Sequence, residues 1–437
     1  NAWDYFVQMI EAARENGYRE NTDVHVRVGY DCYTTYGTPD PILYAYIPVV
    51  KCPEGYQPKT KPEILRMAEN AKKPETHKAY AVIASNGGSY IDGIPMLKWG
   101  EWKDNSYCGC VTVLINAAGI PVSYEDVMGM SGVCWQAIMR GDWDPSSQMP
   151  QNGRLCEKNV GDALGIDVYS IGDENKISEQ AKISLGSGIP VLMVGGRGAP
   201  EWTLTCGYAV ENGQDKFFGR TYFDCQHYEP TKKTIENQSL IIPENEIYTG
   251  NRYFYQRGFP GWFPSVLTRF YDKKCKPIPR KQALMVSLET CIMMFEQQPT
   301  ESHKFGYDAY DVLISGFELN EAEYKKKCGN DCYHIGSLLD ARRAAYIYLE
   351  NSIGLLDGEN KTKLTEVTKI YKSMVDNLLA VVPYNETTPV FNGTPDFTTA
   401  TLTVAQRRKE LAAALKKNKE LERQARVTIK EILNNRT

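Results

Sequence analysis

Apolar positions follow two different spacings along the chain, and the spacing changes near Pro277. Before it, apolar runs such as 108–118 (CGCVTVLINAA) and 191–194 (VLMV) are separated by turn signals. The runs 203–210 and 216–223 flank an Asn-Gly pair, which predicts a β-hairpin. After it, apolar residues recur every three or four positions, which predicts successive helices. The pattern therefore predicts a mixed α/β part followed by a helical part.

Local signals mark further elements of the α/β part. The apolar run at 108–118 is predicted to be helical, and Ser123 with Asp126 forms a capping-box pattern that opens a second helix. A third helix is predicted over 177–186, and 263–270 is predicted to supply another strand. Three helices are therefore expected beside the strands of this part.

The chain is predicted to have three parts. Residues 1–95 combine an amphipathic helix near the start with short strand-like runs, and no chemistry can be assigned to them. Residues 96–275 form the α/β core, and residues 276–437 form the helical domain. Any functional site is therefore sought first in the central part.

The last helix is predicted over 402–434 and has two unlike faces. Its apolar stripe consists of Leu411, Leu415, Ala425, Ile429 and Ile432. The other face is basic, with ten Lys or Arg against four Glu between Thr403 and Thr437. Such a face is typically solvated; the alternative is a patch for an acidic partner, such as a phosphopantetheine-bearing carrier protein.

Composition narrows the class of protein. Of 437 residues, 42% are apolar, and 50 Lys and Arg stand against 54 Asp and Glu, a net charge of −4. This composition is too apolar for a disordered chain and lacks the basic surplus of a nucleic-acid binder. No stretch approaches the roughly 20 apolar residues of a membrane span. We therefore expect no nucleic-acid partner and no membrane association.

The start of the chain and its cysteines bear on its compartment. The chain opens at Asn1 with no secretory signal pattern, so either a targeting segment has been removed or a longer chain precedes it. The twelve cysteines are sparse and several lie in apolar runs, which favours reduced core cysteines and a cytoplasmic location, although a processed or exported form stays open.

Cys328 and Cys332 have zinc-like spacing without a second pair, so we expect neither a metal nor a cofactor.

One cysteine is a candidate nucleophile. Cys108 stands at the start of the helix predicted over 108–118, and the predicted hairpin follows later in the chain. The unpaired amides and the dipole of a helix N-terminus stabilise a thiolate and lower its pKa. The alternative is a small buried residue at a helix start, and the pKa of the thiol decides between the two.

The segment CGCVTVLINAAGIPVSYEDVMGMSG resembles the start of the butirosin-biosynthesis-H type of domain, a relative of the C39-like cysteine peptidases. The resemblance continues, in order, through GIPVLMVGGRGAPEWTLTCGY, FFGRTYFD, PIPRKQALMVSLETCIMMF and LLDARRAAYIYLE, from about residue 96 to the end. It implies a papain-like core, with a helix packed on an antiparallel sheet, followed by a C-terminal helical domain.

The resemblance also implies roles for individual residues. Its nucleophile falls on Cys108, and its orienting Asp matches Asp224. Its basic His falls near Glu201 or Trp202, where this chain has no His, and its oxyanion Gln falls near Trp102. The chain therefore departs from the peptidase pattern at two of these positions.

Two residues are candidates for the missing base. Glu201 could accept a proton if burial raised its pKa, which is ordinarily about 4.3. His227 lies three residues past Asp224, although a His in a polar loop is more often a surface residue. The residues expected to bind substrate around Cys108 are Trp102, Arg197, Trp202, Tyr208, Arg220 and Tyr222.

Two of these arginines have alternative explanations. Arg197 belongs to a Gly-Gly-Arg-Gly loop that either binds an anion or forms a tight turn. Arg220 lies inside a predicted strand, so its charge needs solvent or a partner, for which Asp224 and Glu201 are candidates.

Three functions follow, from different classes. The first is cysteine-dependent transfer of an acyl or aminoacyl group from a thioester, carried by a small molecule or a carrier protein, to an amine, as the resemblance implies. A thioester is already activated, so the missing base would matter less for attack on it than for attack on an amide. The second is a non-catalytic small-molecule or peptide-binding protein on a degenerate papain-like fold, and the third is a cysteine peptidase or amidase. The sequence leaves the oligomeric state open.

Overall fold

The computed structural model of the chain describes residues 12–13, 18–20, 29–31, 44–46, 49–51, 82–85, 87–95, 97, 102–144, 153–171, 174–194, 202–221, 247–248, 253–255, 268–272, 276–328, 331–381 and 405–435. The chain divides into two units, Asn1–Glu75 and Thr76–Thr437, which are described separately below.

In the first unit, the described strands form two antiparallel pairs. β1 (Tyr18–Glu20) pairs with β4 (Val49–Lys51), and β2 (Gly29–Asp31) pairs with β3 (Tyr44–Tyr46). The predicted strand-like character of this region is therefore confirmed at these positions. Most of the helix expected near the start of the chain lies outside the described residues.

The second unit contains a nine-stranded sheet in which every described pairing is antiparallel. Its strands are β5 (Val82–Ser85), β6 (Gly88–Ile91), β8 (Asp167–Ile171), β9 (Val191–Val194), β10 (Trp202–Glu211), β11 (Gln214–Thr221), β12 (Ile247–Tyr248), β13 (Tyr253–Tyr255) and β14 (Thr268–Asp272). The main path runs β12-β13-β11-β10-β9-β14-β8, while β6 pairs with β10 and β5 pairs with β6. Strands from residues 82–91 therefore join the same sheet as the strands of the predicted core.

The predicted hairpin is formed by β10 and β11. Its two-residue turn consists of Asn212 at φ 51° and Gly213 at φ 75°. Positive φ at both turn residues matches the right-handed twist of the strands, and Asn-Gly is the pair that tolerates it best. A register shift between Thr205 and Gly207 marks a β-bulge in β10. The hairpin prediction is confirmed.

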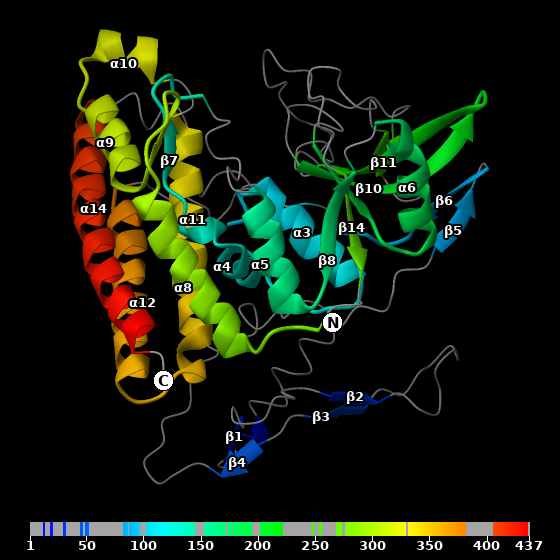
Figure 1. The fold of residues 1–437 in the computed structure, drawn as a ribbon, viewed down its shortest axis with the longest axis horizontal. Coiled ribbons are helices and arrows are strands. Elements are labelled where there is room, and N and C mark those ends of the chain that lie inside the picture. The colour runs from blue at the N-terminus through cyan, green and yellow to red at the C-terminus, as the bar shows by residue number, and fades with distance from the viewer. Residues whose placement is uncertain are drawn as a thin grey trace. The chain divides into compact units, whose positions relative to one another are not determined.

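Four helices belong to the sheet region: α3 (Ser106–Ala117), α4 (Tyr124–Ser131), α5 (Gly153–Leu164) and α6 (Glu174–Gly186). Figure 1 shows α3 on the side of the sheet that faces the helical region and α6 on the far side. The capping box is present, because Asp126 N donates to Ser123 Oγ at 3.0 Å while the Asp126 carboxylate accepts from Ser123 N. The predicted starts of α3, α4 and α6 are therefore confirmed to within a few residues, whereas α5 was not predicted.

The rest of the described chain is mainly helical. Its elements are η1 (Val133–Trp135), β7 (Ile138–Arg140), α8 (Arg280–Glu296), β15 (His303–Phe305), α9 (Gly306–Phe317), α10 (Glu321–Lys327), α11 (Asp331–Ser352), η4 (Ile353–Leu355), α12 (Gly358–Leu379) and α14 (Ala405–Asn434). β7 pairs with β15 in a separate, short antiparallel ladder. None of the helices in the described ranges is both long and apolar enough to span a bilayer. The chain is thus a mixture of helices and antiparallel sheet with a helical C-terminal region.

One hydrophobic core runs through both regions of the second unit. It contains Leu204 of β10 and Cys108 of α3 together with Leu288 of α8, Tyr371 of α12 and Ile429 of α14. Because these side chains pack in one contiguous cluster, the helical region and the sheet stabilise each other. The domain boundary between residues 275 and 276 stays a prediction, and this core continues across it.

A buried ion pair crosses the helical region. Arg342 on α11 and Glu422 on α14 are both fully buried and paired. Glu422 also accepts hydrogen bonds from the hydroxyls of Tyr310 at 3.1 Å and Tyr371 at 3.0 Å. Arg342 Nη1 donates to the main-chain oxygen of Cys134 at 2.9 Å. Buried charges need such partners, and these bonds connect four helices, α9, α11, α12 and α14, to the segment that follows α4.

The basic face of α14 is engaged with neighbouring helices. Lys416 pairs with Glu318 and Lys419 pairs with Asp311, at or near the C-terminal half of α9. Lys430 pairs with Glu296 of α8 at 2.7 Å. Lys416 and Lys430 are about half exposed, as expected for a solvated face, while Lys419 is largely covered by its pairing with α9. The apolar stripe is confirmed, since all five of its side chains are buried.

The described cysteine side chains are free thiols in the interior. They are Cys108, Cys110, Cys134, Cys156, Cys206, Cys291 and Cys328. The prediction of reduced core cysteines is confirmed for these seven.

Candidate functional site

Helix α3 begins at a capped end that carries Cys108. Asn105 is the N-cap, and its Oδ1 accepts from the Cys108 amide at 3.0 Å. The Asn105 amide donates in turn to the hydroxyl of Tyr124 at 3.0 Å. This cap satisfies one of the otherwise unpaired amides of the first turn. The amide of the candidate nucleophile therefore already has a partner.

The thiol of Cys108 is sealed from solvent. Its residue has no exposed area, and Sγ lies 3.8 Å from Ser131 Oγ. Burial raises the pKa of the Cys108 thiol well above its usual range, and the nearby Cys156 and Asp340 raise it further, while Ser131 lowers it. None of these three neighbours carries a positive charge. Burial outweighs the helix N-terminus here, so the thiol is held neutral.

The start of α3 lies against the start of β10. The Trp202 amide donates to Ser106 Oγ at 3.5 Å. The rings of Tyr107 and Trp202 pack edge to face, with centroids 5.3 Å apart. The fold thus brings together the two segments that carry Cys108 and Trp202, although they are distant in sequence.

Trp102 precedes α3 in an unusual backbone conformation. Its φ is +60°, which is uncommon for a residue with a bulky side chain. The guanidinium of Arg343 lies 5.0 Å from the centre of its ring and also pairs with Glu125 at 3.0 Å. Trp102 therefore holds the entrance to α3 against α11.

Arg220 has a structural partner. It is buried in β11, where its Nε donates to the main-chain oxygen of Ile94 at 2.9 Å and its guanidinium lies 4.6 Å from the centre of the Tyr253 ring. Tyr253 also bonds this segment, donating to Ile91 O at 2.6 Å and accepting from Ile94 N at 3.0 Å. Arg220 therefore fixes the loop after β6. Its expected partners Glu201 and Asp224 lie outside the described residues.

The remaining predicted site residues divide into two groups. Tyr208 lies on β10 beneath Lys182 of α6, whose Nζ is 5.1 Å from the ring centre and which pairs with Asp215. Glu201, Asp224, His227, Arg197 and Tyr222 lie outside the described residues. Among the described candidates, only Cys108, Trp102 and Trp202 gather near the start of α3.

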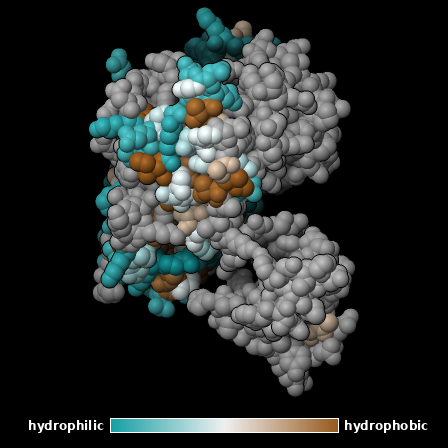
Figure 2. All heavy atoms as spheres, turned by 90° about the vertical axis from the view of Figure 1, so that its right-hand side faces the viewer, coloured by the Kyte–Doolittle hydropathy of each residue, from teal (hydrophilic) through white to brown (hydrophobic). Residues whose placement is uncertain are grey.

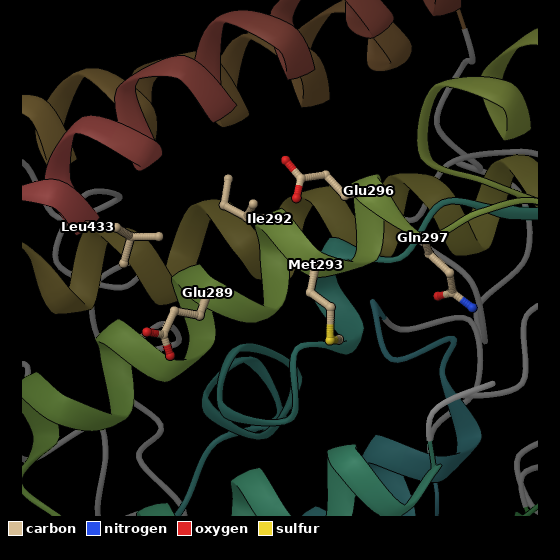
Figure 3. Close-up of a pocket in the computed structure, with 6 residues that line it drawn as sticks. All are labelled: Glu289, Ile292, Met293, Glu296, Gln297 and Leu433. Atoms are coloured by element: carbon tan, nitrogen blue, oxygen red, sulfur yellow. The ribbon is translucent and has the colours of Figure 1, made fainter.

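A surface groove runs along α8 beside the end of α14, as Figure 3 shows. Its volume is about 490 Å³, and it is lined by Glu289, Ile292, Met293, Glu296, Gln297 and Leu433. Met293 is largely exposed, and Glu296 pairs with Lys430 and Arg426 across the groove edge. The groove therefore offers an apolar floor with a charged rim. It is an open depression of the surface rather than an enclosed cavity.

Other exposed apolar side chains lie elsewhere on the second unit. Val82 and Ile83 of β5, Val210 of β10 and Ile183 of α6 are exposed. Figure 2, which views the side that carries β5 and α6, shows apolar areas scattered among polar ones. Single exposed apolar side chains are ordinary on protein surfaces, so these residues do not by themselves indicate a binding site.

Asp340 is a buried acidic residue that was not among the predicted site residues. This residue lies on α11 and is fully buried, and its Oδ2 accepts from the Tyr124 hydroxyl at 2.6 Å. Burial raises the pKa of Asp340 to about 7, and the carboxylate of Asp104 adds to the rise. The available signal was an acidic residue inside the apolar stretch SLLDARRAAYIYLE, where a solvated position is not expected.

Comparison of the chain with models of known protein families and with curated proteins finds no match to either.

Proposed function

We propose that the chain is a non-catalytic binding protein on a papain-like fold, in which Cys108 serves as a packing residue. The observation that carries this proposal is the closed thiol: Cys108 is fully buried, its pKa is raised, and its amide is capped by Asn105. A cysteine nucleophile needs an accessible thiolate and free donors for the oxyanion. In the described residues the thiol is sealed from solvent and protonated, and the amide of Cys108 is already bonded to Asn105.

The groove along α8 is the surface that supports binding best. Ile292, Met293 and Leu433 form its apolar floor, and Glu296 with its cationic partners forms one rim. Because Glu296 is paired with Lys430 and Arg426 and half of the lining residues are apolar, we expect the groove to favour an apolar ligand over a strongly charged one. We therefore propose a small apolar molecule, or an apolar side chain of a peptide, as the ligand class.

Alkylation of Cys108 tests the non-catalytic proposal. We expect iodoacetamide to modify native Cys108 at least about 100-fold more slowly than free cysteine at neutral pH, because the thiol is buried and protonated. The rate is measured by peptide mass spectrometry, and unfolding in guanidinium should restore it. The acetyl thioester of N-acetylcysteamine should leave Cys108 unacylated in the native protein. A rapidly formed acetyl adduct on Cys108 would falsify the proposal.

Substitution in the groove tests the proposed binding surface. Met293→Glu should lower the fluorescence of Nile red bound to the native protein several-fold, because a charge on the floor disfavours an apolar dye. Ile183→Glu on α6 is the matched control, since it also removes an exposed apolar side chain but lies outside the groove. Equal losses in the two variants would show that the dye does not report on the groove.

A second function, cysteine-dependent acyl transfer, is favoured by one observation. The start of α3 lies against the start of β10, with Trp202 bonded to Ser106, which is the pair of segments that the resemblance to C39-like peptidases uses for its nucleophile and base. This function requires the contact to open. Acylation of Cys108 by the thioester in the preceding experiment would support it in place of binding.

A further inference from the structure

A buried carboxylate joins the helical region to the entrance of α3. Asp340 on α11 accepts from the Tyr124 hydroxyl at 2.6 Å and from the Asp104 amide at 3.2 Å, both through Oδ2. Its other oxygen, Oδ1, is buried and has no hydrogen-bond partner among the described residues. A buried carboxylate oxygen without a donor is costly when it is ionised. The arrangement therefore suits the protonated acid better than the carboxylate.

Hydrogen bonds continue from Asp340 to the cap of α3. Tyr124, which donates to Asp340, accepts from the Asn105 amide at 3.0 Å. Asn105 Oδ1 accepts from the amide of Cys108 at 3.0 Å. Segment 102–105 is thus attached to α11 and α4 at one end and caps α3 at the other. Loss of the Asp340 contact would loosen the cap over Cys108.

The charged and titratable groups around Asp340 are mainly acidic. They are Asp104 from the segment before α3, Tyr124 and Glu125 from α4, Cys108 from α3, and Arg343 from the following turns of α11. Arg343 is the only cation of this group, and it already pairs with Glu125 at 3.0 Å and stacks on Trp102. An ionised Asp340 would therefore lie close to the carboxylate of Asp104, while Arg343 is shared with Glu125.

We propose that Asp340 is a pH-sensitive latch that holds segment 102–105 on α11 when it is protonated and weakens its hold when it is ionised. The latch controls access to the capped end of α3 and to the Cys108 thiol. This inference goes beyond the proposed function, because it requires neither a ligand in the groove nor chemistry at the thiol.

The direction of the pH dependence follows from the raised pKa. Asp340 titrates near pH 7 in the closed structure, whereas a solvated Asp titrates near about 3.9. Between these values the closed form binds more protons than the open form, so closure weakens as pH rises. Above about pH 7 both forms are ionised, and the dependence levels off.

Amide hydrogen exchange of the full chain tests the latch. Protection of the peptide covering 102–110, corrected for the intrinsic exchange rate, should fall by up to about tenfold per pH unit between about pH 5 and about pH 7, and then level off. Asp340→Asn keeps the shape and the acceptor for Tyr124 but cannot ionise. Its protection should stay constant over the same range.

Two further variants complete the test. Asp376→Asn on α12, which replaces an exposed aspartate of similar helical setting, should follow the wild-type curve. Tyr124→Phe removes a hydrogen bond that favours the ionised acid, so its fall in protection should extend to higher pH. If Asp340→Asn fails to fold, the shift in Tyr124→Phe decides. A flat wild-type profile, an equal fall in Asp340→Asn, or an unshifted Tyr124→Phe curve would overturn the proposal.

Discussion

Arg342→Leu should lower the free energy of unfolding by about 3–5 kcal/mol, one of the two largest effects expected in this protein. The substitution leaves the Glu422 carboxylate fully buried, with only the hydroxyls of Tyr310 and Tyr371 as donors. It also removes the bond from Arg342 to the main-chain oxygen of Cys134. Urea unfolding monitored by circular dichroism measures the loss.

The double variant Arg342→Leu/Glu422→Leu separates the unpaired charge from the lost packing. Replacing both partners with apolar groups removes the uncompensated carboxylate, so the double variant should be more stable than Arg342→Leu alone. The exposed pair of Lys372 and Asp376 provides a surface comparison, and Lys372→Leu should change stability little. A double variant less stable than the single one would contradict this account of the pair.

Gly219→Ala should destabilise the protein by roughly 3 kcal/mol or more, because the added methyl has no space. A Cβ at Gly219 on β11 would lie 1.8 Å from the main-chain oxygen of Leu204 and 2.9 Å from the Cys206 amide. Both are backbone atoms of β10 beside its bulge, so relief requires the strands to separate. Thermal unfolding followed by calorimetry measures the change.

Gly141→Ala is the matched control for that substitution. A Cβ at Gly141 meets no atom within 4 Å, and the residue is exposed. Its stability should stay within about 0.5 kcal/mol of the wild type. A loss in Gly219→Ala no larger than in Gly141→Ala would mean that the hairpin accommodates the methyl group.

Local patterns in the sequence predicted much of the fold. The Asn-Gly pair gave the hairpin, because its turn depends on two adjacent residues with positive φ. The capping box at Ser123 and the apolar stripe of α14 were equally visible, since each depends on spacing within one helix. Turns, helix caps and helix faces, which depend on residues close together in the chain, can therefore be predicted from the sequence.

The environment of the candidate site is set by contacts between residues far apart in the chain, which spacing along the sequence does not predict. The helix start at Cys108 favours a thiolate, but the thiol is buried against residues of other segments, including Ser131, and burial is the larger effect. Asp340 itself was missed, because its pKa is set by the meeting of α11, α4 and the segment before α3. The resemblance to a cysteine-peptidase relative could point to Cys108 but not to the environment of its thiol.

The order of synthesis gives the shared core a consequence for folding in the cell. Arg342 emerges from the ribosome well before Glu422, its partner on α14, and Ile429 completes the same core later still. Until α14 arrives, the nascent chain carries a cation and an apolar surface that the native structure buries. We therefore expect the core shared by the sheet and the helices to form only after α14 has been synthesised. A ribosome-stalled chain without α14 should bind chaperones.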